Sequence, residues 1–191
     1  MSALLLASGS PRRRELLGRV GLTVTVVPPD VDETRRPGEA AVAYARRLAE
    51  CKVSAVDTAD GEAALAADTV VHRGDAVWGK PEDRRDAIRI LRALSGDWHA
   101  VTTAFAVRRG AELFVDAVTT EVRFRRLSEA EILAYVATGE ADDKAGAYGI
   151  QGAAGSFVAE LRGSWTNVMG LPLEEVLAAL SAFGVTPVEG L

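Results

Sequence analysis

Residues 3–28 read ALLLASGSPRRRELLGRVGLTVTVVP, and this stretch decides the fold class. Its beginning is apolar and predicts a buried strand over 3–7. Pro11 suits the first position of a helix, which is predicted over 11–20. Residues 22–28 alternate between apolar and polar side chains and predict a second strand. A strand, a helix and a strand in succession are typical of the start of an α/β protein.

The rest of the chain continues this alternation of helices and strands. A long helix is predicted over about 38–57, because residues of one face recur every four positions: Tyr44, Leu48, Lys52 and Val56. Ser128 and Glu131 form a capping box at the start of another helix. The other predicted elements are strands over 63–71, 98–108, 111–124 and 156–162, helices over 82–94 and 172–183, and a loop over 163–171.

Length and composition indicate one globular protein. The chain has 191 residues, of which 48% are hydrophobic, and no long linker or repeat divides it. We therefore expect a single domain over 1–191. A net charge of -5 argues against a nucleic-acid partner or a membrane-surface partner, which normally requires a basic face. We expect a cytoplasmic protein, because the sequence shows neither a signal peptide nor an apolar stretch long enough for a membrane span. The single cysteine, Cys51, excludes an internal disulfide and is interpreted as a packing residue.

Lysine and glutamine are rare in this chain. Lysine occurs only at Lys52, Lys80 and Lys144, whereas arginine is abundant, and Gln151 is the only glutamine. A lysine is a compact charge on a flexible stem, which suits contact with phosphate. Lys80 and Lys144 both lie in turn-rich segments, and Gln151 lies in the same glycine-rich segment as Lys144. These residues are candidates for chemistry, and the alternative is an ordinary solvated surface.

Three arginines begin the first predicted helix, after Ser10 as a candidate N-cap. Arg12, Arg13 and Arg14 oppose the helix dipole there, which favours acids at that end. An anion over the free backbone N–H groups would reverse this cost, and phosphate is the natural candidate. The alternative is an arginine face screened by salt. Neither the P-loop spacing nor the dinucleotide-binding glycine pattern is present, so common nucleotide-binding folds are set aside.

Asp68 interrupts the apolar strand predicted over 63–71. A carboxylate is costly there unless a cation, a metal ion or several donors compensate it. It is therefore a candidate catalytic or metal-binding residue, and the alternative is an acid that caps a turn. Carboxylates with few histidines nearby favour Mg²⁺ or Mn²⁺ over zinc. The acids Asp30, Asp32 and Glu33 form a solvated loop or supply a second oxygen ligand, and His72 and His99 are interpreted as structural or exposed.

Six ordered motifs together resemble the Maf family: SGSPRRRELL at 8–17, DVDE at 30–33, ADT at 67–69, GKP at 79–81, DKAGAYGIQG at 143–152 and VMGLP at 168–172. The resemblance runs from residue 4 to about 183. It implies a two-lobed α/β protein with a mixed, twisted sheet flanked by helices, an interlobe cleft and a fold like that of inosine triphosphatase. It also implies a homodimer and an effect on septum formation.

The resemblance implies a nucleoside triphosphate pyrophosphatase that uses a divalent metal ion and releases pyrophosphate and a nucleoside monophosphate. In this family an arginine after Ser-Pro, a threonine after the catalytic aspartate and a glutamine in the glycine-rich motif mark the dTTP/UTP branch. Arg12, Thr69 and Gln151 occupy those places. The 7-methyl-GTP branch carries a tryptophan and acidic residues there, which this chain lacks.

The residue types fit distinct roles in such a reaction. Asp68 would activate the attacking water, directly or through a metal ion that Glu33 also holds. Positive and backbone groups would neutralise the triphosphate: Lys52, Lys80, Arg12, Arg13, and Ser8 with Ser10. Gln151 would recognise the O4/N3 edge of a pyrimidine, Thr69 would close that base pocket, and Lys144 would bind phosphate or brace its turn.

Two further functions compete with hydrolysis of dTTP and UTP. One is the same chemistry directed at noncanonical purines or 7-methyl-GTP. The other is a nucleotide-binding regulator of cell division with little turnover. Replacement of Asp68 by asparagine separates catalysis from binding.

Overall fold

A computed structural model describes residues 4–187 of the chain. The described residues form a mixed α/β fold with a seven-stranded sheet, in the order β2-β1-β3-β5-β6-β7, with β4 paired to β3. The first strand runs parallel to β2 and to β3, whereas β4 on β3 and β7 on β6 are antiparallel. The predicted fold class is therefore confirmed. The strands are β1 (Leu4–Leu6), β2 (Val24–Val26), β3 (Ala63–Arg73), β4 (Ala76–Trp78), β5 (Trp98–Arg109), β6 (Glu112–Phe124) and β7 (Val158–Arg162).

The helices lie close to their predicted places, with two differences. The predicted loop over 163–171 contains a short helix, and the glycine-rich segment contains two short 3₁₀ helices. Ser128 and Glu131 form the predicted capping box in both directions. The helices are α1 (Pro11–Arg19), α2 (Ala41–Ser54), α3 (Arg84–Leu94), α4 (Glu129–Ala137), η1 (Ala145–Ala147), η2 (Ala153–Phe157), α5 (Trp165–Met169) and α6 (Leu173–Ala182).

Contacts between Cα atoms divide the chain into two compact units. Unit 1 consists of the chain up to Asp68, Thr103–Val118 and the chain from Gly170 onward, and unit 2 consists of Thr69–Thr102 and Thr119–Met169. The three long strands β3, β5 and β6 therefore each contribute one part to unit 1 and one part to unit 2.

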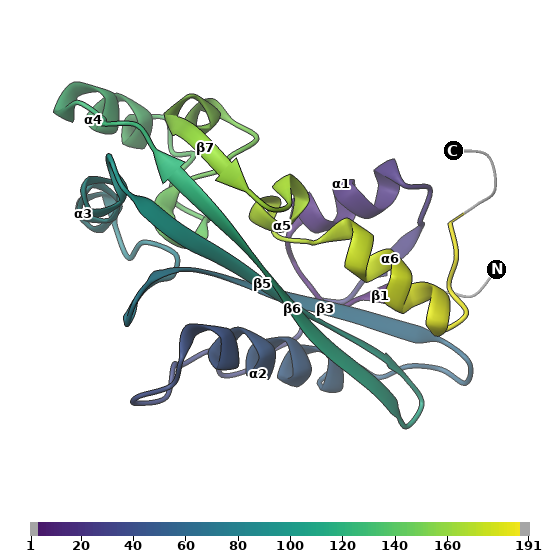
Figure 1. Cartoon of the computed structure of the whole chain (residues 1–191). Helices are drawn as coiled ribbons and strands as arrows, with labels where there is room; N and C mark the ends of the chain where they lie inside the picture. The colour runs from purple at the N-terminus through teal and green to yellow at the C-terminus, as the bar shows by residue number, and fades with distance from the viewer. Residues whose placement is uncertain (1–3, 188–191) are drawn as a thin grey trace. The chain divides into compact units, whose positions relative to one another are not determined.

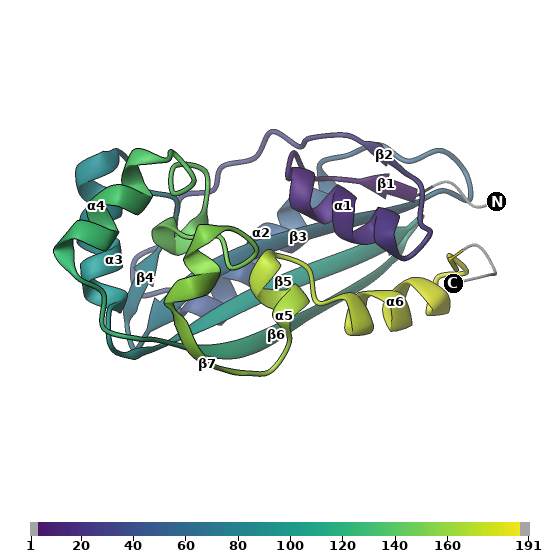
Figure 2. The same ribbon diagram turned by 90° about the horizontal axis from the view of Figure 1, so that it is seen from above.

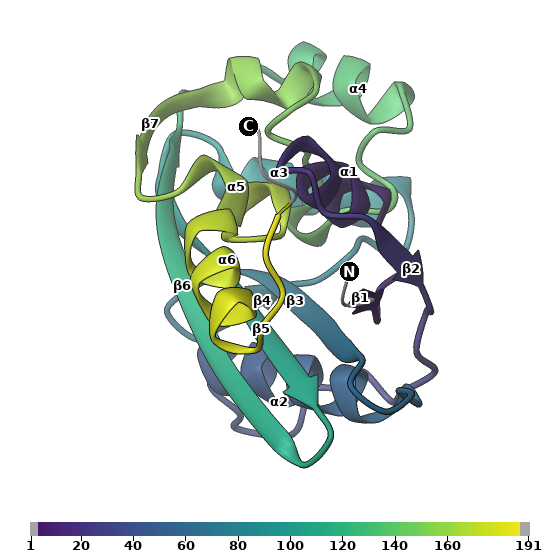
Figure 3. The same ribbon diagram turned by 90° about the vertical axis from the view of Figure 1, so that its right-hand side faces the viewer.

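Unit 1 is a layered arrangement of helices on a sheet. Helix α2 covers one face of its strands, and α1 and α6 cover the other face (Figure 1). The parallel strands β1 and β2 lie side by side, with β2 at the edge (Figure 3). Residues 4–7 and 63–67 are buried, as expected of parallel strands covered on both faces. This core holds the carboxyl ends of β1 and the middle of β3 in place.

Unit 2 contains two helices that lie side by side, α3 and α4 (Figure 2). An ion pair between Arg92 and Glu129 joins them at the surface. The same unit contains a cluster of aromatic rings that pack edge to face, formed by His99, Phe124, Tyr135, Tyr148 and Phe157. Edge-to-face packing is a favourable geometry for such rings. The cluster supports the glycine-rich segment that follows α4.

The interpretation of Cys51 as a packing residue is wrong. Cys51 is exposed, whereas its neighbour Lys52 is buried. The buried face of α2 contains Leu48 and Lys52 at the predicted four-residue spacing, Val56 is buried just beyond the end of the helix, and Cys51 lies off that face. In the described part of the chain, none of the helices is long and apolar enough to cross a membrane.

Candidate active site

Asp68 does not interrupt its strand. β3 runs through it to Arg73, and Asp68 is 8% exposed in the middle of the strand. The carboxylate is compensated by a buried cation, because Lys52 Nζ donates to Asp68 Oδ1 at 2.7 Å. A paired and hydrogen-bonded charge is the form in which a carboxylate is tolerated in a protein interior. The compensation predicted from the sequence is thus provided by a lysine of α2.

Lys52 contacts a second carboxylate. Its Nζ lies 2.9 Å from Glu33 Oε1, so Glu33 and Asp68 converge on one ammonium. The two acids differ in exposure, since 56% of the Glu33 side chain is accessible to solvent and only 11% of the Asp68 side chain is. The loop acid therefore reaches the buried pair from the solvent side. All three residues belong to unit 1.

The loop that carries Glu33 is tied to α2 at that residue and at the next one. Tyr44 Oη donates to the Glu33 carbonyl oxygen at 2.7 Å, and Arg47 donates to the Thr34 carbonyl oxygen at 3.1 Å. Burial raises the pKa of the Tyr44 phenol, and the Asp68 and Glu33 carboxylates raise it further. The phenol therefore stays protonated and remains a donor. Because α2 also carries Lys52, one helix positions both the acid and its cation.

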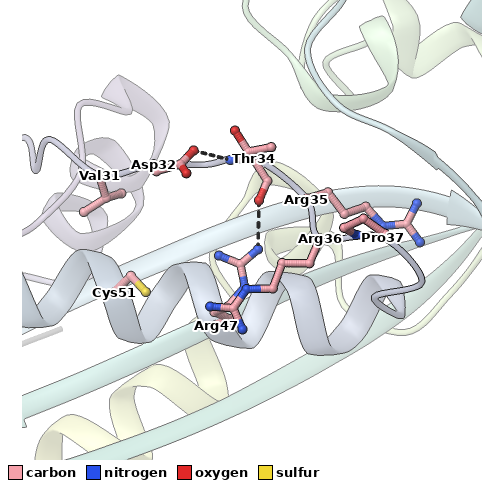
Figure 4. Close-up of a pocket in the computed structure, with 8 residues that line it drawn as sticks. All are labelled: Val31, Asp32, Thr34, Arg35, Arg36, Pro37, Arg47 and Cys51. Atoms are coloured by element: carbon pink, nitrogen blue, oxygen red, sulfur yellow. Dashed lines mark hydrogen bonds between the residues drawn. The ribbon is translucent and has the colours of Figure 1, made fainter.

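A pocket of ≈ 500 Å³ lies between this loop and α2 (Figure 4). Arg47 does not offer a free charge to it, because it forms a two-point contact with Glu39 at 2.7 and 2.8 Å. The Arg47 guanidinium lowers the pKa of Glu39 to about 2. The pocket therefore belongs to the network that fixes the loop. It is lined by Val31, Asp32, Thr34, Arg35, Arg36, Pro37, Arg47 and Cys51.

Arg13 is held in place at the start of α1. Its Nε donates to the Gly170 carbonyl oxygen at 2.8 Å, and its Nη1 donates to Ser8 Oγ at 2.8 Å. Burial lowers the pKa of the Arg13 guanidinium, and the Asp68 carboxylate opposes that shift. The field of Asp68 thus favours the charged form of Arg13, which brings the arginine motif and the aspartate into one electrostatic environment.

Ser10 occupies the predicted N-cap position, but its side chain makes no capping bond. Its backbone N–H donates instead to Ser8 Oγ at 3.2 Å. Ser8 is 5% exposed and therefore accepts from both Ser10 and Arg13 inside the protein. The first turn of α1 contains no acid, as predicted, and Arg12 lies half-buried in it. The helix start is basic and leaves its dipole without an acidic partner.

The donors near Asp68 fit a hard divalent cation. Within residues 4–187, no group of three or more His, Cys, Asp or Glu side chains forms a complete metal site. Glu33 and Asp68 nevertheless converge on a single point, which Lys52 Nζ occupies. Mg²⁺ commonly uses one or two carboxylates together with water and substrate phosphates, so two oxygen donors are sufficient. The carboxylate pair predicted from the sequence is therefore compatible with Mg²⁺ or Mn²⁺.

Unit 2 carries the other candidate residues, and it brings Lys144 close to Gln151. A Cβ placed on Gly149 would lie 2.6 Å from Lys144 Cε and 3.3 Å from Gln151 Nε2. Lys144 Nζ donates to the Glu140 carbonyl oxygen at 2.7 Å and to Asp143 at 2.6 Å. Lys144 therefore braces its own turn, which is one of the two roles predicted for it.

Lys80 is exposed on a loop of the same unit. The carbonyl oxygen of the preceding residue, Gly79, accepts from Gly146 N at 3.0 Å, which ties this loop to η1. Thr69 is half-buried and directly follows Asp68 in β3. The structure thus groups the candidates into two sets. The set in unit 1 contains Ser8, Ser10, Arg12, Arg13, Glu33, Lys52 and Asp68, and the set in unit 2 contains Thr69, Lys80, Lys144 and Gln151.

Both histidines are structural, as predicted. His99 is 3% exposed, and its Nε2 lies 2.8 Å from Tyr148 Oη. Burial lowers its pKa to about 4, so the imidazole is neutral at physiological pH. His72 Nε2 lies 2.9 Å from Thr102 Oγ1, and burial lowers its pKa as well. Neither histidine has the surroundings of a metal ligand.

A family model described as Maf-like protein matches residues 3–183. The chain belongs to the Maf family. This membership confirms the resemblance carried by the six motifs. The roles of the individual residues stay predictions.

Relatives of this Maf protein are similar over nearly their full lengths. The dTTP/UTP pyrophosphatase of Chromobacterium violaceum is 51% identical over 187 residues, which cover 95% of this chain and 94% of that protein. The dTTP/UTP pyrophosphatase of Anaeromyxobacter dehalogenans strain 2CP-C is 55% identical over 185 residues, with the same coverage. Among solved structures, a dITP/XTP pyrophosphatase from Mycobacterium abscessus is 18% identical, with a TM-score of 0.44 over 94% of this chain and 95% of that chain.

Sequence reasoning about the Maf motifs missed two residues that position the site. Tyr44 holds the loop of Glu33, and the Gly170 carbonyl holds Arg13. The sequence contains a feature that could have indicated each of them. Tyr44 lies two helical turns before Lys52 on the same face of α2, and Gly170 is the glycine of the VMGLP motif. Gly170 has a φ of +111°, a backbone conformation that residues other than glycine rarely adopt.

Proposed function

We propose that this Maf protein is a nucleoside triphosphate pyrophosphatase that hydrolyses dTTP and UTP to the nucleoside monophosphate and pyrophosphate. The observation that carries the proposal is the buried Lys52–Asp68 pair, which Glu33 completes from the solvent side. Such a cluster places a base, a cation and a second carboxylate together. The names of the relatives that are 51% and 55% identical support the choice of dTTP and UTP.

In the proposed reaction a water molecule attacks the α-phosphorus. The bond from that phosphorus to the oxygen that bridges to the β-phosphate breaks, and pyrophosphate leaves with the bonding electron pair. Asp68 accepts the proton of the attacking water. Lys52 holds the Asp68 carboxylate in one orientation through its 2.7 Å contact. Because the base is oriented before the substrate arrives, little reorganisation is needed at the moment of reaction.

Glu33 and Asp68 would hold the divalent cation, which we propose to be Mg²⁺ or Mn²⁺. When bound, such an ion neutralises phosphate charge and lowers the pKa of a coordinated water. The exposure of Glu33 allows it to act as a ligand from the solvent side. The ammonium of Lys52 keeps the two carboxylates close despite their mutual repulsion. The cluster is therefore suited to an ion that arrives together with the nucleotide.

Arg12, Arg13 and the start of α1 would neutralise the triphosphate. Arg13 is fixed by Ser8 and Gly170, so binding phosphate costs it little side-chain entropy. A guanidinium and a helix N-terminus both favour phosphate oxygens. We propose that Lys80 adds a further positive charge from its exposed loop.

Gln151 and Thr69 would select the base. The carboxamide of Gln151 both donates and accepts, which matches the N3–H donor and the O4 acceptor of thymine and uracil. Thr69 would close the pocket beside it. Arg12, Thr69 and Gln151 are the three residues that mark the dTTP/UTP branch of the family, and all three are present.

Replacement of Asp68 by asparagine tests the role of the base. Asp68→Asn keeps the size of the side chain but removes its capacity to accept a proton, so we expect pyrophosphate release to fall by at least about 100-fold. Nucleotide binding, measured by calorimetry, is expected to persist. The matched control is Asp32→Asn on the exposed loop, which should retain activity. An Asp68→Asn protein as active as wild type would remove Asp68 from the mechanism, and wild-type binding without turnover would favour the regulator.

The family resemblance also bears on the oligomeric state, the cellular location and septum formation. We propose a homodimer, which light scattering on the purified protein tests. We also propose that the enzyme works in the cytoplasm on free nucleotides, and that any influence on septum formation follows from this activity.

A further inference from the structure

Among the described residues, hydrogen bonds do not hold the side chain of Gln151 in a fixed direction. It is exposed, and within residues 4–187 its carboxamide makes no hydrogen bond. A freely rotating amide selects poorly between bases, because its donor and acceptor have no defined direction. The position of the amide is therefore set by the backbone on which Gln151 lies.

That backbone is a tight turn of four residues. Gly152 N donates to the Gly149 carbonyl oxygen at 3.0 Å, which closes the turn around Ile150 and Gln151. Ile150 is 2% exposed and points into the core of unit 2. The turn thus buries one of its central residues and presents the other to solvent.

The turn is anchored at its first residue by Tyr135. Gly149 N donates to Tyr135 Oη at 3.2 Å, and this bond is buried. Tyr135 is 4% exposed on α4, and its ring packs on Phe157 with 5.2 Å between centroids. Rigid rings packed in a core hold their hydroxyl groups in one place. The hydroxyl of Tyr135 therefore determines where the turn begins.

A second tyrosine holds the residue before the turn. Tyr148 is 5% exposed, and its Oη lies 2.8 Å from His99 Nε2 on β5. The rings of Tyr148 and Phe124 lie 4.8 Å apart in an edge-to-face arrangement. Two buried hydroxyl groups, from Tyr135 and Tyr148, thus fix consecutive residues of the chain.

The far end of the turn is held by Glu140. Its Oε2 accepts from Ala153 N at 3.1 Å. A Cβ on Gly152 would come within 2.2 Å of the same oxygen, so the carboxylate approaches the backbone as closely as only glycine allows. Glu140 is only half-buried, unlike Tyr135.

We propose that Tyr135 is a positioning residue for base selection, because its hydroxyl holds the turn that presents Gln151. This inference rests on the proposed function, in which Gln151 recognises the pyrimidine. Tyr135 does not touch the substrate in this account and acts through the Gly149–Gly152 turn. Removal of the hydroxyl leaves the Gly149 N–H without its acceptor and allows the turn to shift.

The test compares Tyr135→Phe with wild type on dTTP, UTP and GTP. We expect the ratio of kcat/KM for dTTP to kcat/KM for GTP to fall by about 5- to 10-fold, because one directional contact to the base is weakened. A general loss of structure would lower all three rates together and leave the ratio unchanged. The matched control is Tyr44→Phe, which removes a hydroxyl in unit 1 and should change all nucleotides alike.

A double-mutant cycle with Gln151→Ala identifies the route of the effect. If Tyr135 acts through Gln151, Tyr135→Phe changes the ratio in the wild-type background and has no further effect once Gln151 is alanine. An equal change in both backgrounds would overturn the inference. If Gln151→Ala leaves the ratio unchanged, the proposed role of Gln151 fails, and this outcome differs from a failure confined to Tyr135.

Glu140→Ala provides a second variant if Tyr135→Phe does not fold. It releases the other end of the same turn from a half-buried position. We expect the same direction of change in the ratio, again absent in the Gln151→Ala background. An unchanged ratio in a folded Glu140→Ala protein would contradict the account of the turn.

Discussion

The Lys52 ammonium lies within hydrogen-bond distance of two carboxylates that reach it from different segments, a loop and a strand. Two acids alone in this place would repel one another, and the buried one would lack a counter-charge. A lysine at this position therefore contributes both to folding and to the proposed chemistry. The two contributions are separable by measurement.

Lys52→Met keeps most of the stem and removes the charge. We expect it to lower the free energy of unfolding by about 3 kcal/mol, because Asp68 is left buried without its partner. The melting temperature should fall by roughly 10 °C, and hydrolysis should be lost. Calorimetry measures the first effect. The control is Arg19→Met, whose ion pair with Glu15 is exposed on both sides, so its cost should stay below about 1 kcal/mol. Equal melting temperatures for the two variants would contradict the account.

Residue types at the site could be predicted from the sequence, but their pairings could not. A carboxylate at Asp68 in an apolar strand predicts a compensating cation nearby, and the rarity of lysine in the chain makes Lys52 a candidate functional residue. Nothing local indicates that Lys52 supplies that cation, or that Gly170 holds Arg13 across 157 positions of sequence. Such contacts depend on the packing of strands and helices, which periodicity does not specify.

At the scale of elements, strong local signals gave correct predictions. The capping box at Ser128 formed as predicted, and the alternation of helices and strands was confirmed. Helix α5 was missed because it is only one turn and a half long and depends on distant contacts. Asn167 within it donates to the Val101 carbonyl oxygen at 2.9 Å and to Thr120 Oγ1 at 3.0 Å. Tertiary contacts of this kind override weak local propensity.

Strand β5 carries a group whose titration links stability to pH. His99 is neutral and buried, with its pKa lowered from 6.5 to about 4. Between these two values the unfolded chain binds more protons than the folded protein. The free energy of unfolding is therefore highest above pH 6.5 and decreases as the pH falls toward 4, by at most about 3 kcal/mol from this residue.

Chemical denaturation of wild type and His99→Gln at several pH values measures this dependence. We expect a weaker slope between pH 6.5 and 4 in the variant, with a remaining contribution from His72, whose pKa is also lowered. Below about pH 4.5 both proteins should lose stability alike, because folding lowers the pKa values of Glu39 and Glu131 from 4.5 to about 2, so that the unfolded chain binds these protons before the folded protein does. Identical slopes above pH 4 would contradict the neutral, buried state of His99.

At the scale of the whole molecule, the candidate residues divide between the two units. The proposed phosphate and metal residues belong to unit 1, with Lys80 as the exception, and the proposed base-selecting residues belong to unit 2. This division explains why substitutions in the two sets should have different consequences. Changes at Asp68 or Lys52 should affect all nucleotides, whereas changes at Gln151 or Tyr135 should alter the ranking among them.

The most direct test of the central claim is an activity assay of the purified protein that identifies the products and ranks the substrates. It is incubated with Mg²⁺ or Mn²⁺ and a panel of nucleoside triphosphates, with a chelator as control, and pyrophosphate is measured separately from orthophosphate. We predict pyrophosphate and monophosphate from dTTP and UTP above all other nucleotides, and none with the chelator. Release of orthophosphate, a preference for purines, or no turnover across the panel would contradict the account.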